Sequence, residues 1–194
     1  MQTTAAKPLN RKILLGGALL VLVVVAAVII GLPRLLNDVS KNTGSDNIEI
    51  GRAFPRFEME DLKGNRFTPA NLAGKPYILW FTAAWCVPCQ VGAERVGKLD
   101  NQLGGDAFKV LVVFVDDNEP EGALRRWRQK YAPADWIIGY DDSTQSLQRM
   151  VSLQYLDSKY LVDADGVLRN VDFQIARNDY LDLIRRVVEG RSNG

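Results

Sequence analysis

The stretch Tyr77–Glu94, YILWFTAAWCVPCQVGAE, decides the fold and holds the only two cysteines of the 194-residue chain, Cys86 and Cys89. It begins with the apolar run YILWF, which is typical of a central strand buried on both faces. Apolar residues at helical spacing follow the cysteines until Gly104-Gly105, where a helix is expected to end. The first cysteine therefore lies where a buried strand gives way to a helix.

The rest of the body alternates between predicted strands and helices. A hairpin is expected around Lys63-Gly64-Asn65, and Asn178 is expected to cap a last helix that ends at Gly190. This order predicts an α/β fold with a mixed central sheet flanked by helices. The other expected elements are strands within 109–117 and 135–142, helices within 119–133 and 143–151, and a hairpin over 158–173.

The N-terminal segment differs from the body in charge and hydropathy. Residues 1–45 carry five basic and one acidic side chain, a net charge of +4, whereas residues 46–194 carry 19 basic and 22 acidic ones, a net charge of −3. Residues 13–32, ILLGGALLVLVVVAAVIIGL, contain no charge. As a helix with a rise of about 1.5 Å per residue, this run crosses a hydrocarbon core roughly 30 Å thick. We predict a transmembrane anchor at 13–32.

The basic residues that precede this run predict its orientation. Lys7, Arg11 and Lys12 favour a cytoplasmic tail at 1–12, which sends the chain after residue 32 across the membrane. Residues 33–47 are expected to form a linker, and residues 48–194 the folded domain. We therefore expect a single-pass protein of the cell membrane with its C-terminal domain outside the cytoplasm. A cleaved signal peptide is the alternative, but its apolar region usually spans only about 7–15 residues.

Composition limits the chemistry. The formal net charge of +1 gives no bulk case for a nucleic-acid partner. The chain has no histidine, which excludes a Cys-His hydrolase and any histidine general base. A four-ligand zinc site within one chain would have to recruit carboxylates. No cofactor and no resident metal are expected.

The chemistry of the cysteines follows from their place at a helix start. Unpaired backbone N–H groups at that end stabilise a thiolate at Cys86. Cys89 lies about one turn later, close enough to form a disulfide, and Pro88 suits a first helical turn. We favour a redox-active pair. A structural disulfide in so short a loop would constrain the unfolded chain little, and it remains an alternative together with a metal-holding pair.

Two blocks carry a family resemblance. The segment 61–89, DLKGNRFTPANLAGKPYILWFTAAWCVPC, and the segment 159–168, KYLVDADGVL, resemble the membrane-anchored TlpA/ResA-like branch of the thioredoxin superfamily. The likeness covers about residues 48–190 in the order of its patterns, which implies a thioredoxin-like domain over 48–194. It implies that Cys86 is the nucleophile, that Cys89 is the resolving thiol and that Trp85 shields the disulfide. Val87 and Pro88 form the dipeptide between the two cysteines.

The chain departs from the family pattern at three positions. The family's cis-proline, which faces the disulfide, corresponds to Asp157, and no proline occurs after Pro133. The buried acid of thioredoxins corresponds to Trp80, which we expect in the core. The glutamate that ResA-like proteins often carry near the cysteines is also missing. We expect Asp157 to lie near the sulfurs, to replace part of the missing acid and to raise the pKa of a nearby thiol. The alternative is an ordinary loop aspartate that points to water.

The resemblance implies an extracytoplasmic thiol–disulfide oxidoreductase. Its substrates would be exported proteins with dithiols or disulfides, apocytochrome c among them, and a membrane electron donor or acceptor would recycle the pair. Two alternatives belong to other classes. One is a thioredoxin-like binding or metal-holding module with little redox turnover. The other is a thiol peroxidase, although Ala83 stands where such enzymes have threonine and Thr82 is one residue away.

Overall fold

The computed structural model describes residues 48–72, 74–116 and 118–190. The predicted tail at 1–12, anchor at 13–32 and linker at 33–47 lie outside the described residues. Among the residues that are described, no helix is both long enough and apolar enough to span a membrane.

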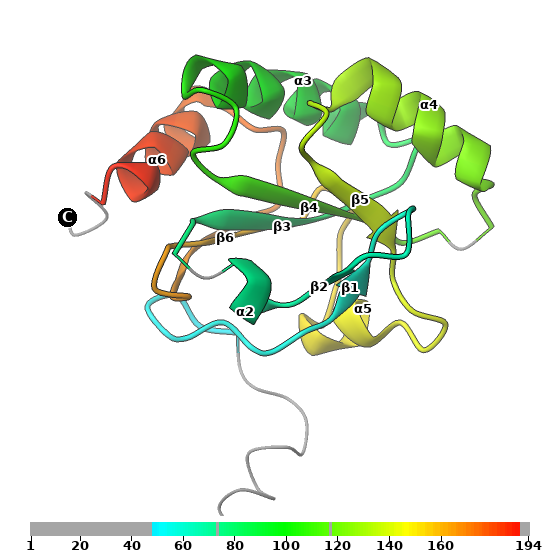
Figure 1. Ribbon diagram of the computed structural model, residues 1–194, viewed down its shortest axis with the longest axis horizontal. Helices are drawn as coiled ribbons and strands as arrows, with labels where there is room; N and C mark the ends of the chain where they lie inside the picture. The colour runs from blue at the N-terminus through cyan, green and yellow to red at the C-terminus, as the bar shows by residue number, and fades with distance from the viewer. Residues whose placement is uncertain (1–47, 73, 117, 191–194) are drawn as a thin grey trace, which may run out of the picture. The chain divides into compact units, whose positions relative to one another are not determined.

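A five-stranded mixed sheet forms the centre of the domain, in the order β5-β4-β3-β6-β7 (Figure 1). The first three strands of this order run parallel to one another, and the last two are antiparallel to their neighbours. The predicted mixed sheet is confirmed. The strands are β3 (Tyr77–Thr82), β4 (Lys109–Phe114), β5 (Ile137–Tyr140), β6 (Lys159–Val162) and β7 (Leu168–Asp172).

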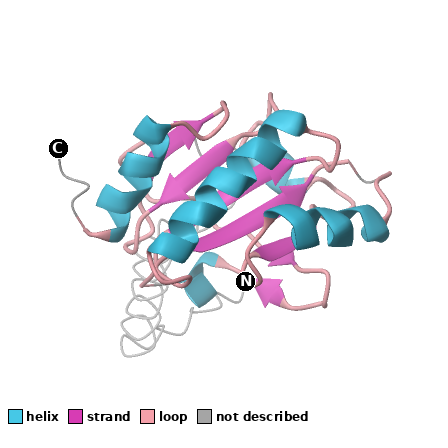
Figure 2. Cartoon of the chain, turned by 90° about the horizontal axis from the view of Figure 1, so that it is seen from above, coloured by secondary structure: helices cyan, strands magenta, loops and turns pink. Residues whose placement is uncertain are grey.

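Other elements cover both faces of this sheet. Three helices lie on one face, as both views show (Figures 1 and 2): α3 (Val87–Gln102), α4 (Glu121–Tyr131) and α6 (Asn178–Val188). The opposite face carries two short helices, α2 (Pro69–Leu72) and α5 (Ser146–Met150), and a hairpin of β1 (Met59–Glu60) and β2 (Arg66–Phe67).

The central strand β3 is buried along its whole length because both faces are covered. Alternate side chains of a strand point to opposite faces, so Ile78 and Trp80 join the core under α3, α4 and α6. Leu79 and Phe81 join the second core, on the other face of the sheet. Full burial of one such side chain contributes about 1.5–3 kcal/mol. The prediction of a strand buried on both faces is confirmed, as is the core position of Trp80.

Two predicted boundaries differ from the structure. The strand expected within 109–117 ends at Phe114, because the Asp116 carboxylate accepts a hydrogen bond from the Asn118 backbone N–H, 3.1 Å away, and turns the chain. The prediction that Asn178 caps the last helix is wrong. Asn178 is the first helical residue, and Arg177 occupies the cap position in an extended conformation without a side-chain capping bond.

Gly139 in β5 tests how closely the β1–β2 hairpin approaches the sheet. A Cβ at this position would lie 2.0 Å from the backbone oxygen of Glu60, which cannot move away as a flexible side chain can. We expect Gly139→Ala to lower the free energy of unfolding by about 2 kcal/mol or more. The control is Gly122→Ala in α4, which meets only the end of the Arg126 side chain at 3.4 Å and is expected to gain up to about 1 kcal/mol. Urea denaturation followed by circular dichroism measures both, and equal effects would contradict the predicted contact.

Candidate active site

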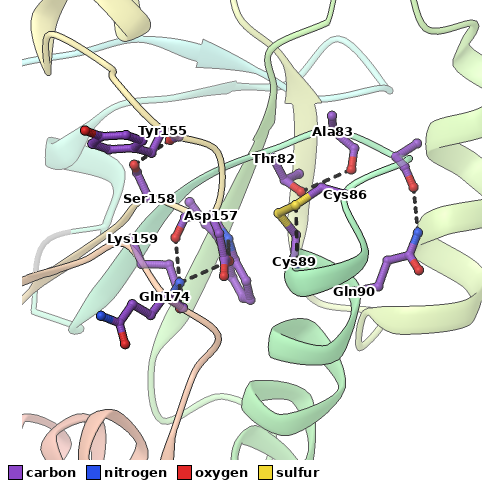
Figure 3. Close-up of a disulfide and its surroundings, with 12 residues drawn as sticks. Thr82, Ala83, Cys86, Cys89, Gln90, Tyr155, Asp157, Ser158, Lys159 and Gln174 are labelled. Atoms are coloured by element: carbon purple, nitrogen blue, oxygen red, sulfur yellow. Dashed lines mark hydrogen bonds and ion pairs between the residues drawn. A yellow bond between two sulfur atoms is a disulfide. The ribbon is translucent and has the colours of Figure 1, made fainter.

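The two cysteines form a disulfide at the N-terminal end of α3 (Figure 3). Their Cα atoms lie 5.3 Å apart. Cys86 is the cap residue of the helix, and its sulfur accepts a hydrogen bond from the Cys89 backbone N–H at 3.3 Å. Pro88 lies in the first turn, where its missing N–H leaves no helical bond unmade. The expected position of the pair, where strand gives way to helix, is confirmed.

The two sulfurs differ in access. Cys86 is 6% exposed, whereas Cys89 is 0% exposed. Both pack with Ala83, and Leu156 covers them from the loop before β6. A group that approaches from solvent therefore reaches Cys86 first. A helix N-terminus, with its unpaired N–H groups, stabilises a thiolate at that sulfur once the disulfide is open.

Two acidic side chains after β4 hold the loop that leads to Cys86. Glu119 accepts a hydrogen bond from the Ala84 backbone N–H at 2.7 Å, and Asp116 accepts one from the Trp85 indole N–H at 3.3 Å. On the other side of the loop, the Gln90 amide donates to the Ala84 carbonyl at 2.7 Å. Both backbone groups of Ala84 are therefore satisfied by side chains, which fixes the approach to the helix.

An apolar cavity of about 610 Å³ opens beside the disulfide. It is partly open to solvent, and most of its lining is hydrophobic. The exposed aromatic ring of Tyr155 lies against Phe173, with 6.1 Å between the ring centroids, and so extends this apolar surface. The lining residues are Trp85, Cys86, Val87, Pro88, Leu156, Asp157, Phe173, Gln174 and Ile175.

Trp85 and Val87 form one wall of this cavity, with exposed fractions of 63% and 64%. Large apolar side chains that stay exposed in a cluster mark surfaces that bind other molecules. Trp85 lies at the rim of the cavity, and its indole N–H is bound to Asp116. The structure thus places Trp85, Val87 and Pro88 beside Cys86, where the sequence puts them.

Asp157 also lines the cavity, and its side chain is buried rather than turned to water. Its carboxylate accepts a hydrogen bond from the Trp80 indole N–H at 2.9 Å and lies 3.0 Å from the Lys159 ammonium. Burial raises the pKa of the Asp157 carboxyl, and Lys159 and Trp80 offset part of that rise. The second carboxylate oxygen is buried without a hydrogen-bond partner.

Two of the three positions that depart from the family pattern are therefore in contact. Trp80, at the site of the expected acid, donates to Asp157, at the site of the expected proline. The indole packs under α3 at Gly92, where a Cβ would lie 3.1 Å from the ring. Asp157 has a φ of +67°, and no peptide bond among the described residues is cis. The buried acid that the family pattern places in β3 is thus found here at Asp157, in the loop before the neighbouring strand β6.

Several residues of the site escape prediction from sequence. The buried Lys159 and the exposed Phe173 and Ile175 belong to the last hairpin and the connection after it. Glu119 is recognisable only as one of several acids near the end of a strand. A lysine that opens an apolar strand, as in KYLV, is the one local signal of an unusual environment.

The geometry also bears on the alternative chemistries. No group of three or more metal-ligating Cys, Asp or Glu side chains occurs within the described part of the chain. The Thr82 hydroxyl is fully buried and donates to the Ala83 carbonyl at 3.3 Å. Peroxide activation needs hydrogen-bond donors aimed at the thiolate, and this hydroxyl is already engaged.

Comparison with known proteins identifies the family. The model of the AhpC/TSA family matches residues 50–171, more than half of the chain. The chain belongs to the AhpC/TSA family. Within this family, the match spans the sheet up to β7, the helices between its strands and both cysteines.

Two curated relatives of this AhpC/TSA chain have names that refer to disulfide chemistry. The thiol-disulfide oxidoreductase ResA of Bacillus cereus is 25% identical over 121 residues, which cover 62% of this chain and 68% of the relative. The thiol:disulfide interchange protein DsbE of Pseudomonas aeruginosa is 22% identical over 148 residues, 72% of this chain and 78% of the relative.

Solved structures show the same fold. The thioredoxin domain of a thiol-disulfide oxidoreductase from Bacteroides vulgatus matches with a TM-score of 0.60 and 19% identity, over 73% of this chain and 99% of that one. A thioredoxin-like protein from Aeropyrum pernix matches with a TM-score of 0.58 and 17% identity, over 85% of this chain and 99% of that one. The domain has a thioredoxin-like fold.

The contribution of Glu119 to the stability of the fold depends on pH. Burial raises the pKa of its carboxyl, the bonds from the Ala84 and Trp85 N–H groups lower it, and nearby Asp116 raises it, with a net rise above 4.5. A carboxyl with a raised pKa in the folded state stabilises the fold below its unfolded pKa, and this contribution is lost as pH rises through the folded pKa.

We expect Glu119→Gln to remove this pH dependence, because glutamine keeps an oxygen for the Ala84 N–H but does not titrate. The free energy of unfolding of the variant, relative to wild type, should increase as pH rises from 4 to 7. Glu119→Ala, which also removes the acceptor, should be about 1–3 kcal/mol less stable than Glu119→Gln at every pH. Urea denaturation at a series of pH values measures both changes. A constant difference between Glu119→Gln and wild type would show that the carboxyl is not buried as described.

Proposed function

We propose that this chain is a thiol–disulfide oxidoreductase that exchanges disulfides with exported proteins through Cys86 and Cys89. The observation that carries the proposal is the unequal access of the two sulfurs at a helix N-terminus. Cys86 is accessible from an apolar cavity and Cys89 is buried behind it. This asymmetry suits a pair in which one thiol attacks a partner and the other stays inside to resolve the complex.

In the reducing direction, both cysteines begin as thiols and the partner carries a disulfide. The Cys86 thiolate attacks one partner sulfur, and the other partner sulfur leaves as a thiolate that takes up a proton. Cys89 then loses its proton and attacks the Cys86 sulfur, which forms the Cys86–Cys89 disulfide and releases the second partner thiol. Two electrons pass to the partner. The reverse sequence oxidises a partner dithiol, and a membrane electron donor or acceptor restores the starting state.

The substrate side of the proposal rests on the cavity. Its lining is apolar and includes Trp85, Phe173 and Ile175, so it suits an extended segment with aliphatic or aromatic side chains next to its cysteine. The names of the ResA and DsbE relatives support thiol–disulfide exchange. We propose exported cysteine proteins as substrates, those of cytochrome c maturation among them.

The cellular setting of the proposal comes from the sequence. An uncleaved helix at 13–32, with the basic residues of 1–12 on its cytoplasmic side, would tether the domain outside the cytoplasm. Exported proteins meet their first disulfide chemistry in that compartment. We therefore propose a single-pass protein of the cell membrane, inserted by this helix.

Trapping of the mixed disulfide tests the function and the setting together. Cys89→Ser should accumulate covalent complexes between Cys86 and exported proteins in intact cells, because no second thiol releases them. Cys86→Ser, the matched control, should accumulate none. A membrane-impermeant maleimide should label Cys86 in intact Cys89→Ser cells after reduction.

The complexes are separated on non-reducing gels and must disappear on reduction. Absence of complexes with Cys89→Ser, or equal amounts with both variants, would refute the exchange mechanism. Protection of Cys86 from the maleimide would refute the proposed orientation.

A further inference from the structure

Lys159 is a buried lysine that no step of the proposed exchange uses. Its side chain is 0% exposed, and it is the first residue of β6. In the sheet register it lies opposite Trp80 of β3 and opposite Asp172 of β7. Directly paired residues of antiparallel strands share a face. The three side chains therefore form a row across three strands.

The ammonium of Lys159 contacts four oxygen atoms. It donates to the backbone carbonyls of Asp157 and Gln174, both at 2.6 Å. It also lies 3.0 Å from a carboxylate oxygen of Asp157 and 3.0 Å from one of Asp172. The Trp80 ring lies below it, with its centroid 5.0 Å away. An ammonium has three protons, so two serve the carbonyls and the carboxylates share the third.

The two carbonyls belong to separate segments that line the cavity beside Cys86. Asp157 lies in the loop before β6, and Gln174 lies in the connection between β7 and α6. Figure 3 shows Lys159 beside Asp157 and Gln174, whose carbonyls it contacts. The buried Lys159 ammonium thus links the two segments by hydrogen bonds to both.

Asp157 has a backbone conformation that non-glycine residues rarely adopt, so hydrogen bonds from its surroundings are needed to hold it. Its φ of +67° lies in the left-handed region, which proline, with φ near −65°, cannot adopt. The proline of the family pattern therefore cannot stand here in this conformation. The position is held by the Asp157 N–H bond to the Phe81 carbonyl at 3.0 Å, by Trp80 at the side chain and by Lys159 at the carbonyl.

We propose that Lys159 is a positioning residue for disulfide exchange. Its buried ammonium fixes the two segments that line the cavity beside Cys86. This inference rests on the proposed function and adds to it a residue that acts by shaping the cavity. A polypeptide substrate must bind in the cavity to bring its sulfur to Cys86, whereas a small disulfide reaches Cys86 without binding there. Lys159 should therefore matter for polypeptides and not for small disulfides.

The test variant must keep the fold. Lys159→Met alone would leave the buried carboxylate of Asp157 and the partly buried one of Asp172 without a cation, which is strongly destabilising. We therefore compare the neutral triple variant Lys159→Met/Asp157→Asn/Asp172→Asn with the double variant Asp157→Asn/Asp172→Asn, which carries the same change at the cavity and keeps the lysine. Asparagine at 157 tolerates a positive φ and still accepts from Trp80.

The matched control is Arg169→Met. It breaks the partly buried ion pair with Asp163, at 2.6 Å, near the turn of the same β6–β7 hairpin. Neither residue lines the cavity beside the disulfide.

The first measurement compares two substrates with the full chain in detergent. One is a peptide with a single disulfide flanked by phenylalanine and leucine, and the other is dithiobis-nitrobenzoate. Relative to Asp157→Asn/Asp172→Asn, the neutral triple variant should show a kcat/KM for the peptide about 10- to 100-fold lower, mainly through KM, and a rate with the small disulfide that agrees within about twofold. Arg169→Met should leave both unchanged. Equal losses on the two substrates, or no loss on the peptide, would overturn the proposal.

The second measurement does not depend on activity. Amide hydrogen exchange of the oxidised full chain at residues 155–158 and 173–176 should be faster in the neutral triple variant than in Asp157→Asn/Asp172→Asn, and Arg169→Met should exchange there as wild type does. If the wild-type chain fails to exchange disulfides with the peptide, the proposed function falls, and amide exchange still decides the role of Lys159. Unchanged exchange at both segments would overturn that role.

Discussion

Burial of β3 on both faces is the constraint on which the rest of this domain depends. A strand covered on two sides needs an unbroken apolar run and a fixed register with both neighbours. The strand ends at Thr82, and the chain leaves the sheet directly into the turn before Cys86. The same register sets Trp80 opposite Lys159. The reactive pair and the charged cluster beside it are thus positioned by one strand.

The charged cluster shows how this chain manages two departures from the pattern it resembles. An indole replaces a carboxylate in β3, and a carboxylate replaces a proline before β6. Of these two changes, the one in β3 alone would leave the buried indole N–H without the acceptor that it has here, which is costly. Together they form a hydrogen bond of 2.9 Å between Trp80 and Asp157. Lys159 then balances the buried charge of Asp157, with Asp172 at its other side.

The sequence allowed much of the fold to be predicted, because the signals involved are local. The apolar run at Tyr77–Phe81, the glycines after α3 and the turn at 164–166 each act over a few residues, and the elements they predict are present. Helix ends were less predictable. Asparagine favours cap positions, yet Asn178 is already helical. The residue before it, Arg177, has the extended backbone of a cap.

The site was predictable only where its residues are adjacent in the chain. Trp85, Val87 and Pro88 surround the cysteines in sequence and in space. Glu119 acts on Ala84 across 35 positions, and Lys159 gathers oxygens from three different positions in two loops and a strand. Such partners are fixed by sheet register and loop paths, which no local pattern encodes. The buried state of Asp157 follows from them as well.

The central claim is that Cys86 and Cys89 are a reversible redox pair, and a redox titration tests it most directly. The full chain is equilibrated in glutathione or dithiothreitol buffers, and the fraction of free thiol is read by alkylation. The account predicts a reversible two-electron transition, near −270 mV for a reductant such as thioredoxin or near −120 mV for a strong oxidant. A pair that stays oxidised across the accessible range, or that binds metal before it forms the disulfide, would contradict the account.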